Sequence, residues 1–320
     1  MHSVCNDGFC FCLLQKRRGN QKVSLVAITG VQVGVTDGID YYVVPEPAAS
    51  AKVAAIESLN FAGNLQELYG EDGGYPQAVV VAKNSAANFC GSLMKELEGA
   101  SDWLLNENTS SESIVQAVNS HLTKGMTPAF NAKNLTKTVI FNCGVGLTYA
   151  SGAKSYVTQF MQKLNEVSDG FGMPADGFFH DGNFSEESYS EKISVYAPDG
   201  APALGLAKLM SESDVRAEYH IVDPTLIHTY VTGKNPVADV CVLPVNLAVK
   251  LLGSGENYKM LGVLTHGNLF LLSANGEKIT GGNISSLKGK RVGVVNLPAV
   301  PGLTFKLILK NYGIEYSEEV

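Results

Sequence analysis

The chain has 320 residues, of which 45% are hydrophobic and 17% are charged, and its net charge is −7. This length and composition predict a globular α/β protein of about two packed units, and they exclude a disordered or fibrous chain. The acidic balance disfavours a nucleic-acid surface, and the apolar runs are too short to cross a membrane.

The N-terminal segment 1–21 differs from the rest, because "VCNDGFCFC" holds three closely spaced cysteines, Cys5, Cys10 and Cys12. Cys-x-Cys can hold a metal, but the partner pair of a zinc site is missing, so we expect no metal. The run "FCFCLL" is too short for a secretory signal, and basic residues follow it instead of preceding it. We therefore predict an N-terminal extension of unclear role. The remaining cysteines lie in apolar or mixed segments that favour buried thiols, namely Cys90, Cys143 and Cys241.

Two segments, 23–50 and 219–248, share one order of features. Each has a strand, a Gly-containing turn, an aspartate, an apolar strand, a proline and an Ala-containing helix start. Asp40 matches Asp239, and the "VVP" after the first aspartate matches the "VLP" after the second. Repeated strand–Pro–helix units are common in parallel α/β proteins, which leaves chance similarity as the alternative. The matches at several ordered positions favour two similar lobes.

Two further segments, 193–210 and 291–314, each begin with an apolar strand, pass through a Gly/Pro-rich turn and end in an amphipathic helix. Strands separated by helices predict parallel sheets, whose ligands bind beyond the carboxyl ends of the strands. The turns "PDGAP" and "NLPAVPG" are therefore candidate parts of a binding site.

The other segments have connecting or covering roles. Apolar runs at 78–83 and 268–273 suit two strands that cross between the lobes, and helical periodicity marks 111–125 and 153–167. The polar, acidic and Ser-rich segment 180–192 is typical of a linker.

Together these segments resemble a known family, the bilobal substrate-binding proteins of ABC importers, in the branch that includes nitrate, sulfonate and thiamine-precursor binders. The resemblance is carried by "APDGAPALGLAKL", "ADVCVLPVNLAVKLL", "LKGKRVGVVNLPAVPGLTFKLILKNYGI", "GIDYYVVPEPAAS" and "GYPQAVVVAK". It implies an α/β fold of the bilobal, type II periplasmic-binding-protein kind. Its two mixed, mostly parallel sheets would be joined by a two-strand hinge.

The order of the elements departs from the family. Elements that come late in the family occupy 22–179 here, and elements that come early occupy 193–320. We therefore expect a circular permutation, in which a linker over 181–190 joins the family's termini and Lys22 lies near Val320 on one lobe. A domain-swapped dimer is the alternative to a permuted monomer. The expected division is lobe B over 22–82 plus 285–320 and lobe A over 83–180 plus 191–275.

The expected ligand contacts come from strand-end turns, which supply carboxylates, amides and the free N–H groups of helix starts. Helix capping is the alternative role for Asp199 and Asn246, and core packing is the alternative for Tyr75. Glu46 has a solvated turn as its alternative, and His266 a structural role. The contacts expected from lobe A are Asp199, Gly200, Ala201, Pro244, Asn246 and His266. Those expected from lobe B are Glu46, Tyr75, Gln77, Asn296, Pro301, Gly302 and Thr304.

No catalytic group of residues is visible in the sequence, so we expect a binding protein without a cofactor and not an enzyme. The candidate turns carry Asp199 and Glu46 but no arginine. This favours a neutral or weakly cationic organic ligand, such as a thiamine-precursor-like pyrimidine, over a small anion. The alternatives are a sulfonate or nitrate binder, and an enzyme similar to thiamine-pyrimidine synthase. The position of that enzyme's Cys-rich motif is occupied here by "GGYPQAVVVA".

The resemblance also implies a partner and a place. The lobes would close over the ligand, and an ABC permease in the membrane would recognise the closed shape. Family members act outside the cytoplasmic membrane, at the cell surface or in the periplasm, although neither a signal peptide nor a lipobox is visible in this chain. We expect a monomer that binds no nucleic acid.

Overall fold

The structure is a computed structural model, and it describes residues 22–70, 74–185, 192–212, 216–274 and 276–319. Part of the expected linker and the whole expected N-terminal extension lie outside the described residues. The three cysteines of this extension, Cys5, Cys10 and Cys12, therefore also lie outside the described residues.

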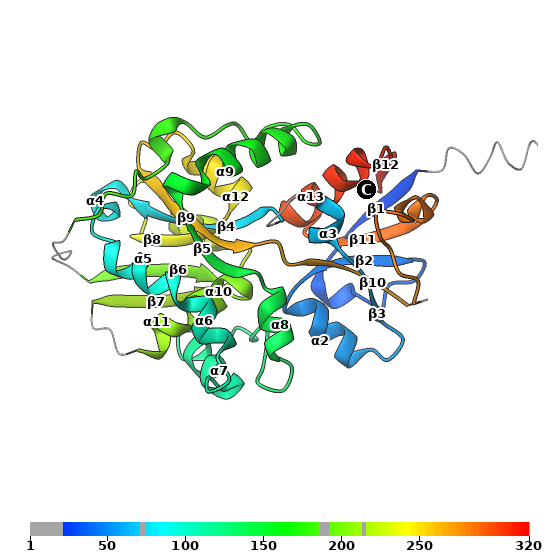
Figure 1. Ribbon diagram of the computed structural model, residues 1–320, viewed down its shortest axis with the longest axis horizontal. Coiled ribbons are helices and arrows are strands. Elements are labelled where there is room, and N and C mark those ends of the chain that lie inside the picture. The colour runs from blue at the N-terminus through cyan, green and yellow to red at the C-terminus, as the bar shows by residue number, and fades with distance from the viewer. Residues whose placement is uncertain (1–21, 71–73, 186–191, 213–215, 275, 320) are drawn as a thin grey trace, which may run out of the picture.

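Two mixed β-sheets of six strands each, with helices on their faces, form the framework (Figure 1). We use the name lobe B for the half built on one sheet (residues 22–70 and 267–319) and lobe A for the other half (residues 74–266). The lobe B sheet has the order β12 (Tyr316–Glu319), β1 (Val23–Ile28), β11 (Arg291–Val295), β2 (Tyr41–Pro45), β10 (Leu269–Ser273) and β3 (Asn60–Asn64). The lobe A sheet has the order β5 (Val145–Tyr149), β9 (Tyr258–His266), β4 (Pro76–Lys83), β8 (Val240–Pro244), β6 (Ile193–Pro198) and β7 (Ala217–Val222). The expected α/β class with two mixed sheets is confirmed.

The strand pairing is less parallel than expected. In lobe B, β12, β1, β11 and β2 pair in parallel, and β10 is antiparallel to both of its neighbours. In the lobe A sheet as described, β6 pairs in parallel with β7 and with β8. The other three pairs, β4 with β8, β4 with β9 and β5 with β9, are antiparallel.

The chain crosses between the lobes beside the two apolar runs expected to make the crossing. β4 lies wholly in the lobe A sheet and β10 wholly in the lobe B sheet. The crossings therefore fall between α3 (Leu65–Tyr69) and β4, and at the turn between β9 and β10. The division by sheets thus differs from the expected breaks at residues 82 and 285. A strand that is buried on both faces is a continuous apolar run, and such a run does not indicate which of the two sheets the strand joins.

Lobe B is covered by helices on both faces of its sheet. Val43 of β2 and Leu271 of β10 face α13, while Val44 and Leu272 on the same strands face α2. This alternation is the two-residue period of a strand buried on both sides. The helical segments of lobe B are α2 (Ala48–Ala55), α3, α13 (Val300–Asn311), η1 (Gly30–Gln32) and η4 (Ile284–Leu287).

Lobe A is built in the same way. Val79 and Val81 of β4 pack on the side of α9 and α12, and Val80 packs on the side of the remaining helices (Figure 1). The helix expected over 111–125 ends at Asn119. Beyond it, Leu122 forms a β-bridge with Ile221 of β7. The α-helices are α4 (Asn84–Ala87), α5 (Gly91–Glu98), α6 (Ala100–Leu105), α7 (Ser111–Asn119), α8 (Lys137–Asn142), α9 (Ala150–Asn165), α10 (Ala201–Gly205), α11 (Ala207–Ser211) and α12 (Val245–Leu252). The 3-10 turns are η2 (Asp176–Phe178) and η3 (Ile227–Tyr230).

The two lobes repeat one strand plan. The order β1-β11-β2-β10-β3 in lobe B corresponds strand for strand to β7-β6-β8-β4-β9 in lobe A. Asp40 and Asp239, matched in the sequence, make the same contacts. The carboxylate of Asp40 accepts from the backbone N–H of Arg291 (2.8 Å), and that of Asp239 accepts from the N–H of Ser194 (3.0 Å). Each aspartate also donates its own N–H to the carbonyl of that partner strand. The internal repeat is therefore structural.

The described ends of the chain lie together on lobe B. β12 forms the edge strand beside β1 and pairs with it in parallel, so that Val26 faces Glu319. Lys22 Nζ lies 3.4 Å from the carboxylate of Glu315. Val320, which was expected near Lys22, lies outside the described residues.

Candidate ligand-binding cleft

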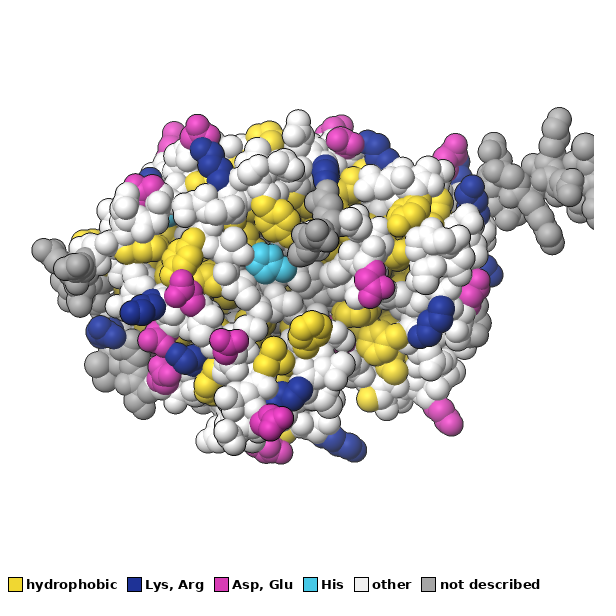
Figure 2. All heavy atoms as spheres, viewed as in Figure 1, with side chains coloured by type: hydrophobic (Ala, Val, Ile, Leu, Met, Phe, Trp, Pro, Cys, Tyr) yellow, Lys and Arg dark blue, Asp and Glu magenta, His cyan; other side chains and the backbone are white. Residues whose placement is uncertain are grey.

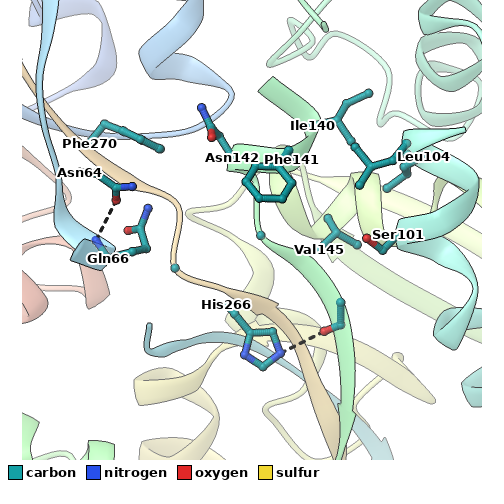
Figure 3. A pocket seen from close by; sticks show the side chains of 14 residues that line it. Asn64, Gln66, Ser101, Leu104, Ile140, Phe141, Asn142, Val145, His266 and Phe270 are labelled. Carbon is teal, nitrogen blue, oxygen red and sulfur yellow. Dashed lines mark hydrogen bonds between the residues drawn. The ribbon is translucent and has the colours of Figure 1, made fainter. Parts of the chain in front are cut away.

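A cleft of about 440 Å³ lies where the chain crosses between the lobes (Figure 3). This volume lies in the range of small-molecule sites. Both lobes supply its walls, and hydrophobic side chains and a histidine show near the middle of this face of the molecule (Figure 2). The lining residues are Asn64, Gln66, Ser101, Leu104, Leu105, Ile140, Phe141, Asn142, Gly144, Val145, Gly146, His266, Gly267 and Phe270.

The lobe A wall is set by the turn from α8 into β5. Thr136 caps α8 by accepting from the N–H of Val139 (3.3 Å). Gly144 then turns the chain with a φ of +62°, and its carbonyl accepts from the N–H of His266 (2.8 Å). The turn packs so closely that a Cβ on Gly144 would lie 2.1 Å from the carbonyl oxygen of His266. This contact holds Phe141, which is 70% exposed, at the rim of the cleft.

The lobe B wall is organised by Gln66. Asn64 caps α3 by accepting from the N–H of Gln66 (3.0 Å), as Figure 3 shows. The side-chain oxygen of Gln66 accepts from the hydroxyl of Tyr75 (2.8 Å) and from the N–H of Leu269 (3.0 Å). Because Gln66 bonds to both crossing segments, it fixes them to one another at the floor of the cleft. The side chain passes over Gly267, where a Cβ would lie 2.4 Å from its Cγ.

His266 is the one expected contact that lines this cleft. Its Nε2 lies 3.1 Å from the carbonyl oxygen of Gly146 and 3.3 Å from Thr148 Oγ1. Its ring stacks on Tyr156 with centroids 6.0 Å apart. Burial lowers the pKa of His266, against the opposing effect of the Gly146 carbonyl. A carbonyl only accepts, so Nε2 carries the hydrogen and Nδ1 is an acceptor.

Glu46 lies beside the cleft and outside its lining. The side chain is 2% exposed, and its oxygens accept from the Ser50 hydroxyl (2.6 Å) and the Ser50 N–H (2.9 Å). The side chain of Asn142 also hydrogen-bonds to the Glu46 carboxylate, so the pair links lobe B to lobe A. Burial raises the pKa of Glu46, although both partners work in the opposite direction.

Tyr75 and Gln77 lie behind the cleft. Tyr75 is fully buried, and its ring stacks on Phe160 (centroids 5.8 Å apart) with Tyr69 at its edge. Core packing, the alternative role for Tyr75, is the one that this placement fits. Gln77 lies in β4, and its buried Oε1 has no hydrogen-bond partner among the described residues.

Asp199 lies at a different cavity, of about 390 Å³, lined within lobe A. Its carboxylate accepts from the N–H groups of Ala129 and Gly200, both at 2.8 Å. Burial raises the pKa of Asp199, and these two N–H groups oppose that shift. Gly200 has a φ of +109°, and Ala201 begins α10 while 2% exposed. The carboxylate therefore fastens the segment before α8 to the end of β6.

The remaining lobe A candidates sit at the start of α12. Pro244 ends β8 and pairs with Ala78 of β4. Asn246 is 5% exposed, and its Oδ1 has no hydrogen-bond partner among the described residues. Such an unpaired buried atom is uncommon in folded proteins and is costly unless something satisfies it.

The "NLPAVPG" candidates build the turn between β11 and α13. Asn296 is exposed with a φ of +58°, and Pro301 is buried in the first turn of α13. Gly302 is required because a Cβ there would lie 2.0 Å from the carbonyl oxygen of Leu297. Thr304 is fully buried, and its hydroxyl has no hydrogen-bond partner within the described part of the chain.

The sequence reasoning missed most of the cleft lining. Gln66 and Asn64 had no visible signal beyond helix capping, and Phe141 and Asn142 lie on a short helix without a long apolar period. Asn268 lies in the turn between β9 and β10, two residues after His266. It bridges the lobe B side by donating to the Glu46 carbonyl (3.2 Å), while its Oδ1 has no partner among the described residues. Cys90, Cys143 and Cys241 are buried, as expected.

Comparison of the chain with protein-family models, curated proteins and solved structures found no match. Within the described ranges, no group of three or more His, Cys, Asp and Glu side chains is placed to hold a metal ion. In the same ranges, no helix is both long enough and apolar enough to cross a membrane.

Proposed function

We propose that the protein is a solute-binding protein of an ABC import system, which captures a small organic ligand between its two lobes. The observation that carries this proposal is the cleft at the double crossing, with walls supplied by both lobes. A site shared between two sheets can close when one lobe rotates about the crossing segments. Closure would bury the ligand and create the shape that a membrane permease recognises.

Contacts between the lobes support a closing motion. The Glu46 carboxylate meets the Asn142 side chain beside the cleft, and Lys310 of α13 lies 2.7 Å from Glu166 after α9. The Lys310 pair is half exposed, so it contributes little to stability and opposes opening only weakly. Both contacts would break when the lobes separate.

The repeated strand plan and the resemblance to substrate-binding proteins support a type II binding-protein fold with permuted order. In this proposal the family's ends were joined through the segment 181–190 and a new opening was made between β12 and β1. These two strands lie side by side, and Lys22 is paired with Glu315.

The permutation has a direct test. The test chain restores the family's order: residues 192–319 come first, a linker of about eight residues follows, and residues 22–185 come last. This chain should fold with an unchanged unfolding midpoint. Failure of this chain to fold, beside a normally folding parent, would contradict the permutation. Light scattering of the parent should give the mass of a monomer, whereas an obligatory dimer would favour domain swapping.

Ligand binding is tested by thermal unfolding in the presence of thiamine precursors, amino acids, sulfonates and nitrate. A ligand that binds only the folded state raises the melting temperature by linkage. We expect a concentration-dependent rise with an uncharged organic compound, and a smaller radius of gyration in solution scattering as the lobes close. Bound iron together with turnover of the ligand would overturn the binding role and favour the enzyme similar to thiamine-pyrimidine synthase.

A further inference from the structure

We infer that the ligand carries a flat, uncharged ring and that Phe141 of α8 covers one face of this ring. The inference rests on the proposed function and adds the class of ligand and a residue that selects it. It comes from three features of the cleft: an exposed aromatic side chain, the absence of charge from the described lining, and the hydrogen-bonding groups left open.

Phe141 is exposed although its neighbours in α8 are buried. Its side chain is 70% exposed, whereas Val139 and Ile140 are 5% and 2% exposed. Single exposed apolar residues are common, and Leu226 is one of them at 50%. Phe141 differs because it lines the cleft and its ring projects into the gap opposite Asn64 and Gln66 (Figure 3). A ring placed at the rim of a closing cleft gains apolar contact only when a ligand fills the space.

The lining of the cleft, as far as the structure describes it, carries no full charge. None of the 14 described residues that line it is Asp, Glu, Lys or Arg. Moving an ion out of water without a charged partner is costly, and the strong hydrogen bonds to anions are those made by charged donors. An uncharged ligand avoids this cost.

Among the described residues, two hydrogen-bonding groups of the cleft remain open to such a ligand. The N–H of Leu269 can only donate, so the Gln66 atom that it meets is the oxygen, and the Gln66 amide nitrogen keeps its donors. Nδ1 of His266 is an acceptor, because Nε2 carries the hydrogen toward Gly146. A ring with one acceptor and one donor, as in a carboxamide or an aminopyrimidine, matches this pair.

The chain contains one tryptophan, and it lies where it can report on binding. Trp103 is in α6 between Ser101 and Leu104, both of which line the cleft. We therefore propose titrations followed by Trp103 fluorescence with four probes. Benzamide and aminopyrimidine are flat and uncharged, cyclohexanecarboxamide keeps the amide on a puckered ring, and benzenesulfonate keeps a flat ring but adds a negative charge.

Benzamide or aminopyrimidine should bind at least about tenfold more tightly than the puckered and the charged probes. Phe141→Ala should weaken this binding about tenfold and leave the melting temperature unchanged, because the side chain is mostly exposed. The matched control Leu226→Ala, which truncates an exposed side chain outside the cleft lining, should bind as the parent does.

The outcomes separate this inference from the proposed function. Equal or tighter binding of the puckered or charged probe, or a Phe141→Ala variant that binds as the parent does, overturns the flat-ring inference and leaves a binding protein. No binding of these probes, together with no thermal shift by any compound of the wider panel, overturns both.

Discussion

Replacing Gly144 by alanine should destabilise lobe A far more than the same change at Gly146, two residues further along the chain. At Gly144 a Cβ would meet the carbonyl oxygens of His266 and Gly267 at 2.1 Å and 2.5 Å, and the backbone φ is +62°. At Gly146 no heavy atom outside the neighbouring residues lies within 4 Å of the added Cβ. The two variants therefore compare one substitution with and without a backbone collision.

The expected magnitude at Gly144 has three parts. The left-handed backbone costs an alanine about 1 kcal/mol, and relieving the collision by moving packed backbone costs roughly 1–3 kcal/mol. Moving the turn also weakens the bond from the His266 N–H to the Gly144 carbonyl, which contributes about 1 kcal/mol. We expect a loss of about 4 kcal/mol, a large part of a typical total stability. Gly146→Ala should stay within about 1 kcal/mol of the parent.

Urea unfolding followed by Trp103 fluorescence measures the effect in lobe A, because α6 packs beside β5. A shift of the midpoint without a change of slope identifies a change of stability. The reasoning is refuted if the free energies of unfolding of the two alanine variants agree to within about 1 kcal/mol.

Three further expectations concern single side chains. Asp239→Asn should lower the free energy of unfolding by about 1–2 kcal/mol at neutral pH. Burial opposes the Asp239 charge, but the bonds from Ser194 and Lys83 outweigh burial and lower the Asp239 pKa. In urea unfolding at acid pH, this loss of stability should therefore fade as the pH drops below the ordinary aspartate value. Glu46→Gln should raise stability at neutral pH, because burial raises the Glu46 pKa. This gain should shrink as the pH falls from the raised pKa toward the ordinary glutamate value and be gone below it, and a gain independent of pH would contradict the assignment. Gly302→Ala should lower the melting temperature by several degrees in calorimetry, because its Cβ would strike backbone, and an unchanged value would contradict that collision.

The sequence was most informative where chemistry is local. The match of Asp40 with Asp239 predicted two similar lobes, and both carboxylates accept from the backbone of the strand inserted beside them. Strand, turn and helix follow one another within about twenty residues in such units, so a single sequence carries their signal. The strand that begins at Ile193 was predicted for the same reason and is confirmed.

The site was less predictable, because its geometry depends on distant partners. A carboxylate in a turn can accept a hydrogen bond from a ligand or from a backbone N–H, and the sequence does not distinguish the two. The Asp199 carboxylate accepts from the N–H of Ala129, which lies far earlier in the chain. Tyr75 illustrates the same limit, since an aromatic residue before a strand has no mark that separates core from lining. Phe141 lies on a six-residue helix, too short for a periodic apolar face.

The strand order also has a consequence for the synthesis of the chain. The lobe A strands follow one another without interruption from Pro76 to His266, whereas the lobe B sheet combines strands from both ends of the chain. A ribosome releases the N-terminal part first, so β1, β2 and β3 emerge long before β11, which must lie between β1 and β2. Lobe A can finish folding while these early strands still have open edges. The lobe that carries Gln66 is therefore completed after lobe A, and the cleft first exists once β11 has joined the lobe B sheet.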